Sequence, residues 1–252
     1  MSLFNEKLKS IHLVEFLALF IILLVAMFGL NYFNIHMNST LMYVIIIAYF
    51  LFKLRNSFSE FKEDLLNIFS EVSAETIVSI VFLNIFFSYG MLYFSDFILQ
   101  WVNAGDFHVP FMSLNGGIIG ILGFLSVVFL SPIAEELIFR GIFLNKLKII
   151  VPTTFAVLIS SLLFASLHSF GSIFSAFIFG ICMAILYLKS ENILVPIFGH
   201  FINNLIGESV YHLDCGEILF TNWLAVDIMS VFAVVSFVLL LKFICSNLKI
   251  FK

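Results

Sequence analysis

Long apolar runs constrain this chain more than any other feature of its sequence. Most of them approach the roughly 20 apolar residues that an α-helix needs to cross the hydrocarbon core of a bilayer. Only 11% of all residues are charged, whereas soluble domains carry about 25%. We therefore predict an all-α, polytopic transmembrane helix bundle with about eight transmembrane helices. The eight runs cover residues 11–30, 38–54, 76–95, 114–140, 152–169, 172–189, 192–208 and 223–245.

No internal repeat or low-complexity tract divides the sequence, and we predict a single membrane domain over residues 1–252. The segment Phe58–Glu75 differs from the apolar runs because charged residues are interspersed with Phe, Leu and Ile. That amphipathic pattern predicts a helix lying along the membrane surface. Three scattered cysteines indicate neither a disulfide framework nor a cysteine-based metal site.

The positions of the basic residues predict how the helices are oriented. If the runs cross the membrane alternately, all twelve lysines and arginines fall on one side. The segments expected on the other side, 31–37, 96–113, 169–171 and 209–222, carry none. Because positive charge accumulates on the cytoplasmic side of membrane proteins, we expect a multi-pass protein of the cell membrane with both termini cytoplasmic.

Three of the apolar runs contain charged, imidazole or amide side chains. Charge at bilayer depth costs on the order of a few kcal/mol, so such residues usually have a function. A helix rises about 1.5 Å per residue, and this rise places the three groups at similar depths. The sequence therefore predicts that they surround one buried site. The candidate residues are Glu135, Glu136, Arg140, His168, His200 and Asn204.

The spacing of these residues indicates how they could work. Glu136 and Arg140 are four residues apart, so they share a helix face and can form an ion pair. Glu135 lies about 100° around the helix from Glu136, and it is left to act as a general base. His200 and Asn204 also share a face, where imidazole and amide donors suit an oxyanion. The alternative interpretation is a structural ion-pair network without chemistry.

The three motifs resemble those of the CPBP intramembrane protease family. That family includes type II CAAX prenyl proteases and bacterial proteins linked to bacteriocin processing and immunity. The motifs are Glu-Glu-x-x-x-Arg, Phe-x-x-x-His and His-x-x-x-Asn, and the resemblance covers a core of about residues 114–208. Glu136 and Arg140 would complete the first motif.

By position, the resemblance implies that Glu135 is the carboxylate that activates water, with the assistance of His168. It also implies that Arg140 orients the carboxylates. His200 and Asn204 would stabilise the oxyanion of the tetrahedral intermediate. The partners implied are a peptide or lipidated protein substrate and membrane lipid, and no nucleic acid.

The cofactor is left open by the sequence. Members of the family are often named metalloproteases, and a glutamate mechanism without a permanent metal has also been proposed. Glu135, His168 and His200 could bind zinc and leave a fourth position open. The helical His-Glu-x-x-His pattern is absent. A divalent metal such as zinc and a metal-independent mechanism are both compatible with these residues.

We thus predict an intramembrane endopeptidase that cleaves a membrane-associated peptide or a C-terminal CAAX-type substrate. One alternative is a proton-coupled transporter, because Glu and His side chains relay protons in membranes, but no inverted repeat supports it. Another is a non-catalytic membrane immunity or scaffold protein. The chain has no Gly-x-Ser-x-Gly motif for a serine nucleophile. Gly105-Asp106 lacks a second intramembrane Asp, so an aspartyl dyad is not expected either.

Overall fold

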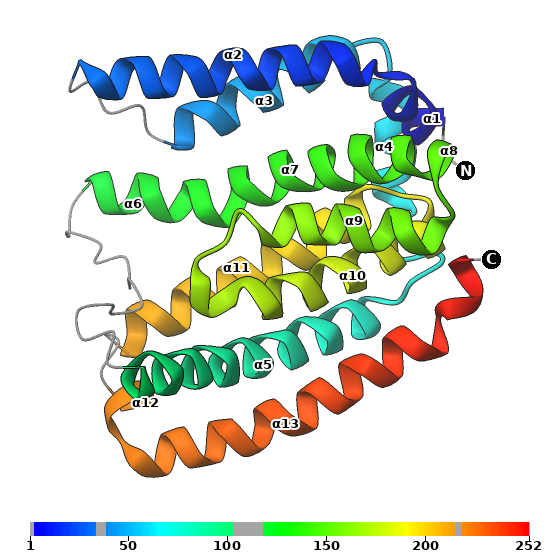
Figure 1. Cartoon of the computed structure of the whole chain (residues 1–252). Coiled ribbons are helices and arrows are strands. Elements are labelled where there is room, and N and C mark those ends of the chain that lie inside the picture. The colour runs from blue at the N-terminus through cyan, green and yellow to red at the C-terminus, as the bar shows by residue number, and fades with distance from the viewer. Residues whose placement is uncertain (1–2, 34–38, 103–117, 215–217, 252) are drawn as a thin grey trace.

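A computed structural model describes residues 3–33, 39–102, 118–214 and 218–251. Over these four ranges the protein is helical and contains no strand. Most of the long helices run roughly along one direction and pack side by side (Figure 1). The predicted all-α bundle is therefore confirmed.

Every predicted apolar run is largely helical where the structure describes it. The fourth run, whose residues 114–117 lie outside the described ranges, belongs to one helix that continues to Ile150 and changes its winding several times. Its parts are α6 (Ile118–Leu125), η1 (Ser126–Leu130), α7 (Ser131–Glu136), η2 (Leu137–Leu144) and α8 (Asn145–Ile150). The other runs form α2 (Leu13–Tyr32), α3 (Ser39–Lys53), α5 (Ala74–Trp101), α9 (Thr153–Ala165), α10 (Ile173–Ser190), α11 (Leu194–Asp214) and α13 (Trp223–Ser246).

Five helices in the described part of the chain are long and apolar enough to cross a membrane. They are α2, α5, the composite helix from α6 to α8, α10 and α13. The pair α3 and α4 (Phe58–Leu66) passes the same test as a unit that is bent by 108°, which would make six. These apolar helices indicate a membrane protein. The number of eight crossings stays a prediction.

The surface helix predicted over Phe58–Glu75 is shorter in the structure than the sequence suggested. Helix α4 ends at Leu66, and α5 begins at Ala74. The Asn67 amide closes α4 with a hydrogen bond to the Glu63 carbonyl. The side chain of Ser73 accepts a hydrogen bond from the Thr76 amide and so starts a new helix.

Helix α10 lies in the interior of the bundle, and α2 and α13 lie on its outside (Figure 1). Of the apolar window in α10, 72% is buried, compared with 11% in α2 and 17% in α13. Helices α2 and α13 therefore present large apolar side chains outward, as helices that face lipid do. The candidate residues lie on α7, η2 and α11 and just after the end of α9.

One end of the bundle collects α1 (Leu3–Ser10), α4, α8 and η4 (Leu248–Phe251) (Figure 1). Lys7 pairs with Glu60 of α4 at 3.0 Å, and the ammonium of Lys146 donates to the Lys9 carbonyl at 2.6 Å. Burial and the neighbouring Lys148 lower the pKa of Lys9. These contacts hold α1 and α4 against the end of the composite helix.

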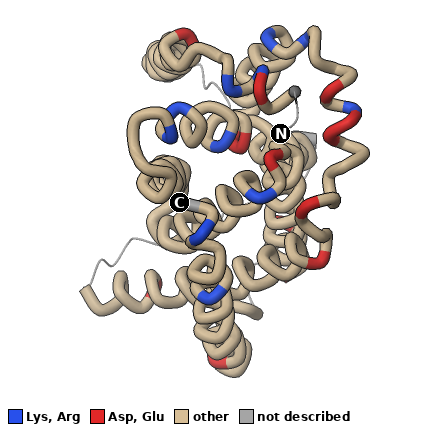
Figure 2. The backbone as a smooth tube through the Cα atoms, turned by 90° about the vertical axis from the view of Figure 1, so that its right-hand side faces the viewer, with Lys and Arg blue, Asp and Glu red and all other residues tan. Residues whose placement is uncertain are grey.

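The same end carries the basic residues of the described chain, apart from Arg140 in the interior. Figure 2 looks onto this end and shows the lysines and arginines spread across it. They are Lys7, Lys9, Lys53, Arg55, Lys62, Lys146, Lys148, Lys189, Lys242 and Lys249. The asymmetry seen in the sequence is thus an asymmetry of the folded bundle.

Candidate active site

The composite helix from α6 to α8 departs from α-helical winding on both sides of the two glutamates. Segments η1 and η2 are π-helical and flank the short α7. Such segments are rare and frequently occur at functional sites. In the π register the amide of residue 132 would bind the Val127 carbonyl, but Pro132 has no amide hydrogen to donate. The side chain of Asn204 supplies that donor instead, at 2.9 Å from the Val127 oxygen.

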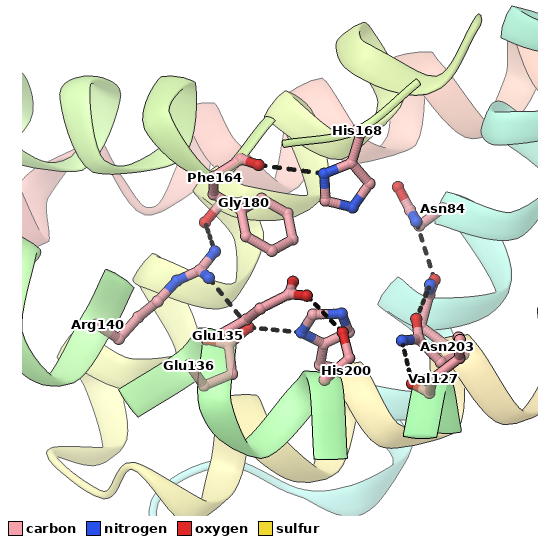
Figure 3. Close-up of polar contacts among 12 residues, drawn as sticks. Asn84, Val127, Glu135, Glu136, Arg140, Phe164, His168, Gly180, His200 and Asn203 are labelled. Atoms are coloured by element: carbon pink, nitrogen blue, oxygen red, sulfur yellow. Dashed lines mark hydrogen bonds and ion pairs between the residues drawn. The ribbon is translucent and has the colours of Figure 1, made fainter. Parts of the chain in front are cut away.

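Glu136 and Arg140 form the ion pair that their spacing predicts (Figure 3). Both side chains are almost completely buried. Nη1 of Arg140 donates to Oε1 of Glu136 at 3.0 Å, and Nη2 donates to the Gly180 carbonyl at 2.8 Å. The guanidinium also lies 4.8 Å from the centre of the Phe164 ring. Arg140 is therefore held by a carboxylate, a backbone oxygen and an aromatic face.

Gly180 lets α10 approach α9 closely enough to present its carbonyl to Arg140. A Cβ atom at this position would lie 3.0 Å from the Ser161 Cβ and 3.3 Å from the Phe164 ring. Both distances are tighter than ordinary packing contacts, so a larger residue would push the two helices apart. A glycine at position 180 is therefore needed for the contact between α10 and Arg140.

Glu135 is not left without partners, which corrects the expectation from sequence. Its Oε1 accepts hydrogen bonds from the hydroxyl of Ser131, one turn earlier, and from Tyr43 of α3 at 3.2 Å. The side chain is nearly buried, at 8% exposure. It also forms part of the wall of a cavity of about 310 Å³ between α2, α3, η2 and α9, whose lining is mostly apolar.

His168 lies in the turn that follows α9, because the helix ends at Ala165 rather than near residue 169 as predicted. Its Nδ1 is 3.1 Å from the Phe164 carbonyl. A carbonyl oxygen can only accept, so Nδ1 carries the hydrogen and a neutral ring has its lone pair on Nε2. Figure 3 shows this ring and that of His200 arranged around the carboxylate of Glu135.

His200 and Asn204 come from α11 and make different contacts. Nδ1 of His200 is 2.9 Å from Oε1 of Glu136, so this carboxylate oxygen is shared with Arg140. The His200 ring is also packed edge-to-face against Phe164 and Phe179. The amide of Asn204 binds the π-helical backbone as described above. For both residues the role in stabilising the oxyanion stays a prediction.

A comparison with known protein families matches the part of the chain that carries the candidate site. The family model described as type II CAAX prenyl endopeptidase Rce1-like matches residues 116–206. Over this segment the protein resembles a CAAX prenyl endopeptidase. All six candidate residues lie inside the Rce1-like segment, so the resemblance inferred from the motifs is confirmed. No curated protein and no solved structure matches the chain.

Three polar residues at the site were not predicted from the sequence: Ser131, Asn84 and Tyr43. Ser131 had a usable signal, because it precedes Glu135 by one helical turn. Asn84 is a buried amide in an apolar helix, and it donates to Asn203 at 2.9 Å. Tyr43, like Asn84, lies outside the Rce1-like segment, and nothing in the sequence indicated that α3 would contact the first motif.

The histidines and carboxylates of the site are not clustered as a ready-made metal site in the described part of the chain. Within the described ranges, no group of three His, Cys, Asp or Glu side chains could hold a metal ion. Binding of zinc by Glu135, His168 and His200 stays a prediction. In both imidazoles Nδ1 faces a protein acceptor, the Phe164 carbonyl in one and Glu136 in the other. Metal-binding histidines commonly make such a contact, and Nε2 would be the nitrogen that holds an ion.

Proposed function

We propose that the protein is an intramembrane endopeptidase that cleaves a lipidated CAAX-type peptide or another membrane-associated peptide. The observation that carries this proposal is the position of Glu135. This carboxylate lies beside two histidines in the interior of the bundle and borders an apolar cavity of about 310 Å³. A base at the edge of an apolar pocket suits hydrolysis of a substrate that arrives from the membrane.

In the proposed reaction, Glu135 takes a proton from a water molecule, and the resulting hydroxide attacks the carbonyl carbon of the scissile bond. Nε2 of His168 can accept a hydrogen bond from the same water and orient it. Glu135 then returns the proton to the leaving amine as the tetrahedral intermediate collapses. Atoms and protons balance, because one water is added across one peptide bond.

The oxyanion of that intermediate needs a hydrogen-bond donor, and His200 can provide one through Nε2 when both its nitrogens are protonated. In that form two carboxylates, Glu135 and Glu136, face two cations, Arg140 and His200. The four charges sum to zero, which reduces the cost of keeping them in the interior. The pairing of His200 with Glu136 supports this arrangement.

The apolar cavity supports a substrate with an apolar chain near its cleavage site. Its wall includes Phe16, Met42, Ile46 and Phe139, with Glu135 among its few polar residues. Aliphatic side chains or a prenyl group would bury apolar surface there at about 25 cal/mol per Å². The same surface gives no favourable contact to a charged peptide segment.

The placement in the membrane follows from the charges. The basic residues cluster at the bundle end that carries α1 and η4 (Figure 2). Under the positive-inside rule this end is cytoplasmic. We therefore propose a multi-pass protein of the cell membrane with both termini in the cytoplasm, and a substrate that enters from the cytoplasmic leaflet.

The proposal is tested with purified protein in liposomes and a synthetic peptide that ends in a farnesylated Cys-Val-Ile-Met sequence. We expect mass spectrometry to find a new C-terminus at the farnesylated cysteine, and slower cleavage of the peptide without the farnesyl group. Glu135→Gln should abolish this cleavage. Glu75→Gln is its matched control, because Glu75 is an exposed glutamate at the start of α5. Absence of cleavage of both peptides by the wild-type protein would refute the CAAX-type substrate.

A further inference from the structure

Helix α3 contributes a hydroxyl group to the carboxylate that we propose as the base. The phenol of Tyr43 donates to Oε1 of Glu135 at 3.2 Å, and Ser131 donates to the same oxygen. Tyr43 belongs to a separate part of the chain, before the Rce1-like segment at residues 116–206. The site is thus completed by a helix that the family match does not include.

Two donors on one oxygen distinguish the two oxygens of the Glu135 carboxylate. Oε1 has both of its lone pairs directed at hydroxyl groups of the protein. Oε2 receives no hydrogen bond from the described residues. Since a carboxylate can rotate about its terminal torsion with little resistance, the two hydroxyl groups fix its plane. That leaves Oε2 as the oxygen able to take a proton from water.

We propose that Tyr43 is a positioning residue, which together with Ser131 holds the Glu135 carboxylate with Oε2 directed at the reacting water. The half-buried ring of Tyr43 also lines the 310 Å³ cavity, so the same side chain borders the space where the substrate would lie. The inference rests on the proposed function, since it assigns Glu135 as the base.

The kinetic test uses Tyr43→Phe, which removes the hydroxyl and keeps the ring, and the farnesylated peptide described above. We expect kcat to fall about 10- to 100-fold, as for the loss of a hydrogen bond to a charged group. The KM should change less than about twofold, because substrate binding does not need the hydroxyl. A kcat equal to that of the wild type would overturn the inference.

Tyr49→Phe is the matched control. Tyr49 lies on the same helix, and its buried hydroxyl has no hydrogen-bond partner among the described residues. Removal of this hydroxyl should leave kcat unchanged. If Tyr49→Phe lowered kcat as much as Tyr43→Phe does, turnover would be sensitive to any change on α3. That result would count against a positioning role for Tyr43.

A double-mutant cycle separates positioning from packing. Tyr43 and Ser131 hold one oxygen together, so the losses in kcat from Tyr43→Phe and Ser131→Ala should not multiply in the double variant. Fully multiplicative losses would show that the two hydroxyl groups act independently, which contradicts the proposal.

A thermal measurement does not depend on the substrate, so it keeps the inference testable if the peptide is not cleaved. Tyr43→Phe should lower the unfolding temperature by about 3–12 °C, as the loss of one hydrogen bond to a charged group would in a chain of this size. In a Glu135→Ala background the same change should lower it by less than half as much. Equal shifts in both backgrounds would refute the contact, whereas failure of cleavage alone would refute only the proposed CAAX-type substrate.

Discussion

The substitution Arg140→Met tests the electrostatic core of the site. Arg140 is completely buried, and it neutralises Glu136 while it binds the Gly180 carbonyl. Methionine keeps an unbranched apolar chain in the same space and removes the charge. Glu136 would then be a buried carboxylate whose remaining charged partner is His200.

The expected loss follows from the burial of the pair. Removal of one partner from a buried ion pair costs about 3–5 kcal/mol. In a chain of this size one kcal/mol corresponds to about 2–4 °C, so the unfolding temperature should fall by about 6–20 °C. Lys7→Met is the control, since Lys7 pairs with Glu60 at the same 3.0 Å but is 43% exposed. Exposed pairs contribute about 0–1 kcal/mol.

A thiol-reactive fluorophore measures this unfolding in detergent. Cys182 is fully buried in α10 and becomes reactive only when the bundle opens. Cys245 is exposed and is replaced by Ser, as is Cys215, which lies outside the described residues. The increase in fluorescence during heating then measures the unfolding of the core around the site.

A second variant decides whether the loss comes from the stranded charge. In the double variant Glu136→Leu with Arg140→Met, apolar side chains replace both ions, a change that is often neutral or stabilising. We expect its unfolding temperature to return to within a few degrees of the wild type. The reasoning is refuted if Arg140→Met melts like the wild type, or if the double variant is less stable than the single one.

Three further predictions use the same preparations. His168→Gln should lower turnover by about 100-fold, the usual contribution of an acid–base or water-orienting group, while the unfolding temperature stays within a few degrees of the wild type. Gly90→Leu should destabilise the bundle by about 1–3 kcal/mol, because a Cβ at Gly90 would lie 2.3 Å from that of Ala233; unchanged melting would exclude this tight contact between α5 and α13. Purified protein should hold well under one equivalent of zinc, and chelators should slow it only partly. One stoichiometric metal, lost together with activity and restored by zinc, would contradict that expectation.

The helices and the polar motifs were predictable from sequence because each signal is local. Apolar runs of the length of a bilayer mark the spans, and the four-residue spacing of Glu136 and Arg140 brings them together on one turn. Where a local signal competes with a longer pattern, the prediction was less accurate. The predicted surface helix ends early at Leu66, before the cap at Ser73 that starts α5, and the turn after Ala165 moves His168 out of its helix.

The partners of Glu135 could not be predicted in the same way. The contact with Tyr43 joins residues that are 92 positions apart. It depends on how α3 packs against α7, and apolar patterns do not specify which face of a helix meets which neighbour. The hydrogen bond from Asn204 to the Val127 carbonyl likewise depends on a π-helical segment, which no residue pattern in the sequence predicts. Such contacts are decided by tertiary packing.

The central claim is that Glu135 is the base of a peptidase, and one comparison of turnover tests it most directly. Glu135→Gln keeps the shape and both hydrogen bonds at Oε1 but cannot take a proton. With the farnesylated peptide in liposomes, we predict that this variant retains less than a few per cent of wild-type kcat, with an unfolding temperature close to the wild type. A folded Glu135→Gln protein that cleaves at more than that rate would place the catalytic role elsewhere.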